Sequence, residues 1–211
     1  MSWASLISRS WLRPVGEVAQ AEHPAAPIAV LSGPTFATVA ATFHATQAPT
    51  VSFPGIDIDL AKVVHGSQSV TLHRPIPAAG TAVTTTKIAE IQDKGSAAVI
   101  IQESETVSAD GEKLWTSRSG IFAKGEGGFG GERGTSEKVE YPERDADHTI
   151  EVATLPQQAL FYRLCGDRNP LHSDPAFAKA AGFDAPILHG LCTYGLTCRA
   201  VLQTYADYDP T

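Results

Sequence analysis

Four segments with alternating apolar and polar residues constrain the fold of this chain more than any other feature. They are rich in Val, Ile and Thr, which suit a pleated, half-buried surface, and they cover residues 63–76, 81–91, 97–107 and 113–123. A period of two residues turns one set of side chains towards a core and the other towards solvent. The sequence therefore predicts four β-strands that share a buried face.

The short connections between the last three segments indicate how the strands pair. Residues 92–96 read QDKGS and residues 108–112 read SADGE, and both contain the Asp, Gly and Ser residues that tight turns use. Strands joined by such short turns run antiparallel. We therefore expect an antiparallel meander over 81–123. Before these segments, only Gly33–Thr46 is apolar and Ala-rich enough to predict a helix.

A glycine-rich segment divides the chain into two halves. Residues 124–134 contain six glycines in eleven positions and are followed by a highly charged stretch, a composition typical of a linker. Gly125 to Gly130 formally matches GxGxxG. No helix is expected after it, however, and phosphate binding by this motif needs a helix N-terminus at the third glycine. The sequence therefore does not support a dinucleotide-binding site.

The second half is predicted to contain one short strand, 148–154, and three helices. Pro156 suits the first turn of a helix that runs to about Leu164. Asp174 suits the N-cap of a second helix, which Gly182 would end. A third helix should begin near His189 and Gly190, and its apolar spacing continues to about residue 206. One strand cannot cover this long apolar helix, so we expect the sheet of this half to be incomplete.

Composition limits the classes of partner and compartment. The formal net charge is −7 and the isoelectric point about 5.4, whereas domains that bind nucleic acid usually carry a basic surface. Cys165, Cys192 and Cys198 are odd in number and show no metal-site spacing, which favours a reducing compartment. The first sixteen residues lack a continuous apolar run, so we expect neither a secretory signal nor a membrane span, and a cytoplasmic protein.

The residues that carry chemistry are concentrated in YRLCGDRNPLH, residues 162–172. Asp167, Asn169 and His172 lie within six positions, on a loop that is expected to join two helices. A carboxylate and an imidazole held by a rigid Asn-Pro turn can share one water molecule as an acid–base pair. The alternative is that Asp167 and Asn169 cap the turn while His172 packs in the core.

The string GDRNPLHSDPAFAKAAGFDAPILHGLCTYG resembles the hydratase motif of the MaoC-like, hydratase 2 family, including its Gly-Asp-x-Asn-Pro-aliphatic-His core and its His-Gly helix start. Further upstream, HGSQSVTLHRPIPAAG and IQDKGSAAVI resemble the first repeat of the larger, double-hotdog members. The resemblance covers roughly residues 50–208. It favours the acid–base interpretation over simple capping.

The resemblance implies an α+β hotdog fold, in which an antiparallel sheet wraps around a central helix, in the double-hotdog arrangement. Residues 1–124 would form an N-terminal repeat that holds the substrate, and 125–148 the linker. Residues 149–211 would begin the catalytic repeat. The remaining strands of that repeat are expected after Thr211, so we expect a fragment or a sheet supplied by another chain.

The resemblance also implies a reaction, the reversible hydration of trans-2-enoyl-CoA to (R)-3-hydroxyacyl-CoA, of the kind used in β-oxidation of fatty acids or sterol side chains. Asp167 and His172 would flank the catalytic water, and Asn169 would orient it. Gly190 would donate its backbone N–H to the thioester oxygen, because a helix N-terminus has free N–H groups and partial positive charge. Simple helix capping is the alternative for Gly190. No metal or redox cofactor is expected, since the CoA thioester is the substrate.

In the first repeat, the resemblance implies that His65, Gly66 and Lys94 contact the CoA ester. An ammonium group on a hairpin turn can reach a phosphate at low desolvation cost, although turn lysines are often merely solvated. Two other functions stay open: a non-catalytic acyl-CoA-binding subunit of a heteromer, and a hotdog thioesterase. We expect a homo-oligomer or heteromer, with neither nucleic acid nor membrane as partner.

Overall fold

The computed structural model describes residues 33–43, 45–53, 56–77, 79–136 and 140–209. The expectations for the first sixteen residues lie outside these ranges. Among the described helices, none is both long and apolar enough to cross a membrane.

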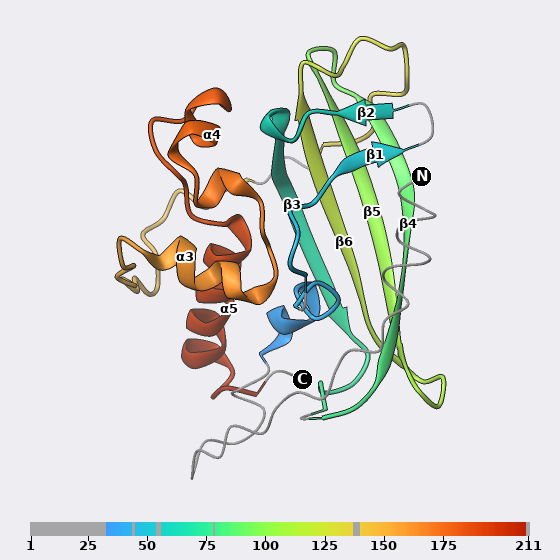
Figure 1. Cartoon of the computed structure of the whole chain (residues 1–211). Helices are drawn as coiled ribbons and strands as arrows, with labels where there is room; N and C mark the ends of the chain where they lie inside the picture. Colours follow the sequence, from blue (N-terminus) through green and yellow to red (C-terminus); the bar gives the residue numbers. More distant parts are fainter. Residues whose placement is uncertain (1–32, 44, 54–55, 78, 137–139, 210–211) are drawn as a thin grey trace.

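One four-stranded antiparallel sheet dominates the first half (Figure 1). Its strands follow the four predicted segments closely, and the last three form the predicted meander. The spatial order is β3-β6-β5-β4, so the first strand pairs with the last one. The bounds are Val63–Leu72 for β3, Ala82–Asp93 for β4, Ala97–Ser108 for β5 and Lys113–Lys124 for β6.

Smaller elements cover the two ends of this sheet. At one end, β1 (Val51–Phe53) and β2 (Ile56–Ile58) form a hairpin, which is followed by a 3-10 turn, η2 (Leu60–Lys62). Together with residues of the sheet, these elements form one apolar cluster. A 3-10 helix, η1 (Pro34–Thr38), packs on a second cluster. The core residues of the two clusters are Val51, Ile58, Val63, Ala98, Ile100 and Ala123, and Ala37, Ala40, Ala82, Leu114 and Trp115.

The helix expected over 33–46 is therefore only a short 3-10 helix followed by turns. The hydroxyls of Thr38 and Thr42 donate to the carbonyls three residues earlier, Thr35 O at 2.7 Å and Val39 O at 3.0 Å. Such local side-chain bonds compete with regular helix formation, and β-branched residues weaken it further.

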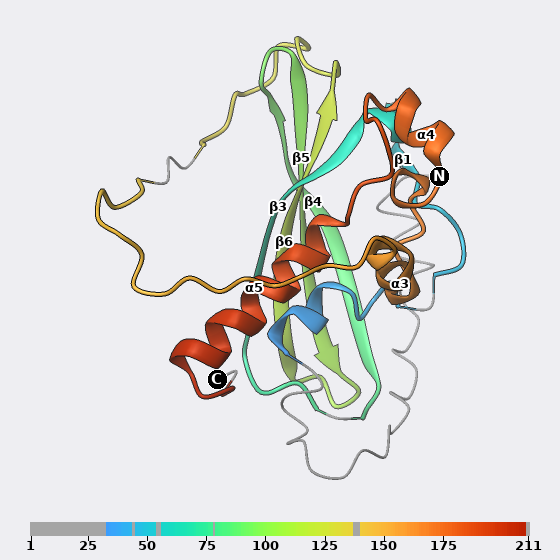
Figure 2. The same ribbon diagram turned by 90° about the vertical axis from the view of Figure 1, so that its left-hand side faces the viewer.

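The second half contains the three predicted helices. They are α3 (Gln158–Tyr162), which continues into the 3-10 turn η3 (Arg163–Cys165), α4 (Pro175–Ala180) and α5 (Gly190–Tyr205). Asp174 caps α4 as expected, since its Oδ1 accepts from Ala176 N at 2.8 Å. Figures 1 and 2 show these helices on the β3 side of the sheet, and η1 contacts α5.

The strand predicted for 148–154 is wrong. This stretch is extended but carries no strand assignment, and its residues are exposed. A β-strand is stabilised by hydrogen bonds to a neighbour, and no described strand pairs with this segment.

The glycine-rich segment is not a free linker along its whole length, because it wraps around a buried carboxylate. Asp93, at the end of β4, is only 8% exposed. Its two oxygens accept from the backbone N–H groups of Gly95, Gly128 and Gly130, each at 2.8 Å. The N–H groups of Gly128 and then Gly95 lower the pKa of Asp93 most strongly. Backbone N–H groups that would suit an anionic ligand thus bind a side chain of the same chain.

Replacing Asp93 with Asn should release this segment. The substitution replaces one carboxylate oxygen with an NH2 group. This NH2 group then faces a backbone N–H, so two hydrogen-bond donors oppose each other. We expect a lower Tm and faster tryptic cleavage after Lys124 and Arg133 than in the parent. Because the folded-state pKa of Asp93 is depressed, its contribution is present above the unfolded value near 4 and is lost as the pH falls through the folded value.

The matched control is Asp57→Asn, which changes an exposed carboxylate on β2. It should leave both the Tm and the cleavage rate unchanged. Equal cleavage of the Asp93 and Asp57 variants would show that the carboxylate does not hold the segment.

Candidate active site

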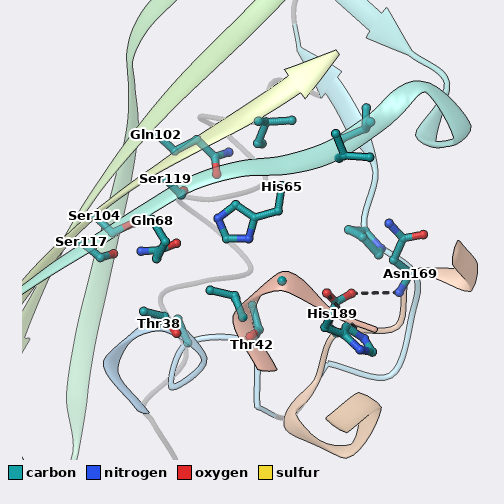
Figure 3. Close-up of a pocket in the computed structure, with 18 of the residues that line it drawn as sticks. Thr38, Thr42, His65, Gln68, Gln102, Ser104, Ser117, Ser119, Asn169 and His189 are labelled. Carbon is teal, nitrogen blue, oxygen red and sulfur yellow. Dashed lines mark hydrogen bonds and ion pairs between the residues drawn. The ribbon is translucent and has the colours of Figure 1, made fainter. Parts of the chain in front are cut away.

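A cavity of about 420 Å³ separates the sheet from the motif of the second half, within the ~300–1,000 Å³ common for small-molecule sites. Side chains from both halves of the chain line it, as Figure 3 shows. Its lining includes four of the residues singled out in the second half and one from the first, namely Asp167, Asn169, His172, Gly190 and His65.

Hydrogen bonds within the motif fix the loop that bears the acid and the amide. Asp167 Oδ1 accepts from Asn169 N at 3.0 Å, and Asn169 Oδ1 accepts from Leu171 N at 3.0 Å. Asn169 thereby caps the 3-10 turn η4 (Pro170–His172). Gly166 precedes the loop with φ of 101°, and a Cβ there would collide with the Thr42 carbonyl. Only glycine lets the loop approach the turns that follow η1 so closely.

These bonds do not engage the second oxygen of Asp167, Oδ2, whereas the side-chain oxygen of Asn169 is used in capping. Asn169 therefore caps the turn, as the alternative interpretation of the sequence expects. Both Asp167 and Asn169 nevertheless also line the cavity.

The orientation of His172 follows from one contact. Its Nδ1 lies 2.8 Å from the carbonyl oxygen of Ile187. A carbonyl can only accept, so Nδ1 carries the proton and Nε2 is the unprotonated nitrogen of the neutral ring. His172 therefore offers a proton acceptor whose tautomer is set by the backbone.

The sequence predicts His189 only as the start of the third helix, whereas the structure places it beside both His172 and Asp167. It is 2% exposed, and its ring stacks on His172 with centroids 3.7 Å apart. Its Nε2 lies 3.9 Å from Asp167 Oδ2, which is too long for a hydrogen bond. Among the described residues, neither ring nitrogen has a hydrogen-bond partner.

Burial, and next the proximity of His172, lower the pKa of His189 to about 4. The ring is therefore neutral at pH 7, and its contact with Asp167 is no ion pair. Tyr162, whose ring lies 4.8 Å from His189, has a raised pKa for the same main reason, burial.

Gly190 is the first residue of α5, and His189 is its N-cap. Backbone N–H groups of a first helical turn have no partner within the helix, and the helix dipole adds partial positive charge there. A Cβ built on Gly190 would meet no heavy atom within 4 Å. The glycine is therefore not required by packing, and its surface faces open space next to the cavity.

Replacing Gly190 with Ala should preserve the fold but impair catalysis. The added methyl fits the empty site, yet it would occupy the space through which a ligand oxygen approaches the N–H. Losing one such donor typically costs ~10²–10³ in kcat. We expect an unchanged Tm and a fall of that order, measured by thermal unfolding and steady-state kinetics.

Gly195→Ala is the control on the same helix, because a Cβ there would make only ordinary contact with Thr35 Oγ1 at 3.7 Å. If Gly190→Ala retained parental kcat, the approach of the ligand to this helix terminus would be excluded.

The remaining predicted contacts lie at different places. His65 lines the cavity from β3, with its Nε2 2.8 Å from Ser67 O. Gly66 forms the bulge next to it and does not line the cavity; a Cβ there would lie 3.3 Å from Gly120 O. Lys94 lies on the β4–β5 turn, also outside the lining, and its Nζ donates to Ser136 Oγ at 3.2 Å.

Three side chains of the site could in principle hold a metal ion. Asp167, His172 and His189 offer ligand atoms that all lie within 4.8 Å of one another. The absence of a metal and a redox cofactor from the reaction stays a prediction.

The sequence reasoning missed the wall opposite the motif. It consists of polar side chains on one face of the sheet, whose signal is the alternation of Ser, Thr and Gln within the strands. They are Gln68, Thr84, Thr86, Gln102, Ser104, Thr106, Ser117 and Ser119.

Comparisons with known proteins identify the family of this chain. The family described as "MFE-2 hydratase 2 N-terminal domain" matches residues 24–125, and the "MaoC like domain" matches residues 137–210. The enoyl-CoA hydratase ChsH3 of Mycobacterium tuberculosis is 57% identical over 178 residues, covering 84% of this chain and 62% of the relative. The peroxisomal multifunctional enzyme type 2 of Mus musculus is 43% identical over 180 residues, covering 83% of this chain and 24% of the relative.

A solved structure shows the same fold. The MaoC-like dehydratase from Phytophthora capsici superposes with a TM-score of 0.74 at 32% identity, covering 84% of this chain and 63% of that one. The chain thus spans less than two thirds of the length of these relatives. The two matched domains, their order and the superposition agree with the hotdog α+β fold, and the chain belongs to the MaoC-like, hydratase 2 family.

Proposed function

We propose that this chain carries the site for reversible addition of water to a trans-2-enoyl-CoA, which yields an (R)-3-hydroxyacyl-CoA. One observation carries the proposal: Asp167, His172 and the N-terminus of α5 face the same cavity. A carboxylate, an imidazole of fixed tautomer and a free N–H group are the three functions that this reaction needs. The relatives named as hydratases support the assignment.

The residues divide the reaction between them as follows. A water held between Asp167 and His172 loses a proton to one of them as its oxygen adds to C3 of the double bond. The pair returns a proton to C2, so atoms and charge balance. Gly190 N–H stabilises the negative charge that develops on the thioester oxygen. Asn169, whose side chain caps η4, holds Asp167 through its backbone N–H.

The CoA contacts remain part of the proposal. His65 lies at the cavity wall, where it can meet the pantetheine arm. Gly66 and Lys94 would act beyond the cavity, and the free donors of Lys94 suit a phosphate. A cytoplasmic location belongs to the same proposal.

The assay uses crotonyl-CoA and two readouts. We expect the enoyl absorbance to fall without release of free thiol, and chiral chromatography to identify the (R)-3-hydroxybutyryl ester. Thiol release would instead show a thioesterase. Binding of the ester without turnover would show a non-catalytic acyl-CoA-binding subunit.

Self-association is also expected, because large apolar side chains of α3, η3 and α5 are exposed. Contiguous exposed apolar surface usually marks an interface. Light scattering should therefore report a homo-oligomer, or a heteromer once a partner is supplied; a monodisperse monomer at micromolar concentration would contradict this. On these three elements, the large apolar residues that are more than half exposed are Leu160, Phe161, Leu164, Val201 and Tyr205.

A further inference from the structure

A second cavity, of about 470 Å³, lies at the end of the sheet where β3 leads into β4 and β5 turns into β6. Its walls include Ile76 and Pro77 of the β3–β4 connection, Ala109 of the β5–β6 turn and Phe36 of η1. Most of its lining side chains are apolar, which suits a hydrocarbon chain. None of the described residues that line it belongs to the motif, so it is separate from the proposed site of reaction.

Trp115 on β6 stands between this second cavity and the cavity that holds the motif. Among the described residues, it alone lines both. Its side chain lies on the same face of the sheet as those of Ser117 and Ser119, which follow at alternate positions. It is 4% exposed and packs in one apolar cluster with Ala37, which lines the first cavity, and Ala82, which lines the second. The indole is therefore a wall between two cavities, and a wall acts through its bulk alone.

The path from the motif to Trp115 leads away from the proposed phosphate contact. Lys94 lies on the β4–β5 turn, whereas Trp115 lies next to the β5–β6 turn. These turns are at opposite ends of β5, whose 12 residues span roughly 40 Å at ~3.3 Å per residue. Ser104 and Ser117 form the row next to Trp115, and Figure 3 shows them on the side of the pocket away from Asn169. An acyl chain that leaves the thioester in the direction opposite to CoA therefore runs towards Trp115.

The sheet wall along this path can accept an aliphatic chain. Thr84 and Thr106 share a hydrogen bond of 2.8 Å, and Thr86 and Ser104 share one of 2.7 Å. Because these hydroxyls are already paired with one another, an apolar chain laid over them leaves no hydrogen bond unmade. The indole of Trp115 then closes the path with an apolar surface.

Resting on the proposed function, we infer that Trp115 sets the longest acyl chain that the cavity accepts, by closing it off from the second cavity. Each methylene that is buried before Trp115 strengthens binding. Methylenes beyond that point have to fold back or stay in water. A smaller side chain at this position would join the two cavities, which have similar volumes, and give the acyl chain about twice the room.

The test measures calorimetric binding of saturated esters, from butanoyl-CoA to dodecanoyl-CoA, to the whole chain. In the parent, affinity should rise several-fold with each added pair of methylenes and then reach a plateau. With Trp115→Leu it should continue to rise, so that the preference for dodecanoyl-CoA over butanoyl-CoA is at least tenfold larger than in the parent. Trp115→Phe keeps more of the packing and should shift the plateau in the same direction by less.

Leu114→Ala is the matched control, because Leu114 is also 4% exposed and belongs to the same cluster, yet lines only the second cavity. It should lower the Tm and leave the plateau where it is. The preference is a ratio measured on one protein, so a less stable variant still reports it.

A parent affinity that rises through dodecanoyl-CoA, or a plateau that neither Trp115 variant moves, would overturn the inference and leave the proposed function standing. A shift of equal size in Leu114→Ala would show that looser packing admits the chain, and the wall would have no role. Failure of every CoA ester to bind would overturn the proposed function, and the inference with it.

Discussion

Replacing Asp167 with Asn is expected to lower kcat for enoyl-CoA hydration by ~10²–10⁴, the range for loss of a general acid or base. The change is nearly isosteric. The amide oxygen can still accept from Asn169 N, so the loop geometry and ligand binding should survive. The measurement is steady-state kinetics with crotonyl-CoA, together with calorimetric binding of a saturated ester. His172→Gln should show a loss of similar order.

Asp174→Asn is the matched control, because Asn is as good an N-cap as Asp and the residue serves α4. It should keep parental kcat and Tm. Turnover of the Asp167 variant within about threefold of the parent would remove this carboxylate from proton transfer, since even the low end of the expected range is ~10².

Acid unfolding should depend on His189 more than on any other described histidine. Its pKa falls from 6.5 to about 4 on folding, so between these values the unfolded chain binds more protons than the folded one. Stability therefore falls as the pH drops through this window. The contribution is complete above about pH 6.5 and lost below about pH 4.

His189→Phe should remove this dependence, because an uncharged ring can keep the stacking position but cannot titrate. We expect the midpoint of acid unfolding, followed by circular dichroism, to move to lower pH, with a flatter stability profile between pH 4 and 6.5. His73→Gln changes an exposed histidine and should leave the profile unchanged. Identical acid transitions in the two variants would show that His189 does not titrate across this window.

The sheet was predictable because its signals are local. Alternation within each strand, and Asp-Lys-Gly and Ala-Asp-Gly in the turns, define both strand positions and antiparallel pairing without any long-range information. The helix over 33–46 was less predictable, since Thr38 and Thr42 bond to the backbone. The segment 148–154 shows that a strand pattern without a partner does not make a strand.

The motif residues of the site were predictable from their spacing in one short loop, where Asn169 and Asp167 organise their own backbone. The rest of the site depends on contacts between distant segments. His189 becomes buried only when Tyr162 and His172 pack on it. Gln102 becomes part of a cavity only through strand register and the approach of η1 and the motif. The alternation within β5 marks the face that bears Gln102, but no local pattern shows that this face lines a cavity or that His189 is buried.

The attachment of the glycine-rich segment to Asp93 has a consequence for how the two walls of the cavity meet. One wall belongs to the sheet and the other to the motif, and the residues after Gly134 join them. Asp93 holds Gly128 and Gly130 against the end of β4, so fewer residues separate this attachment point from the motif. A shorter tether raises the effective concentration of one wall at the other. The carboxylate of Asp93 therefore favours assembly of the two walls of the cavity, although Asp93 does not line the cavity itself.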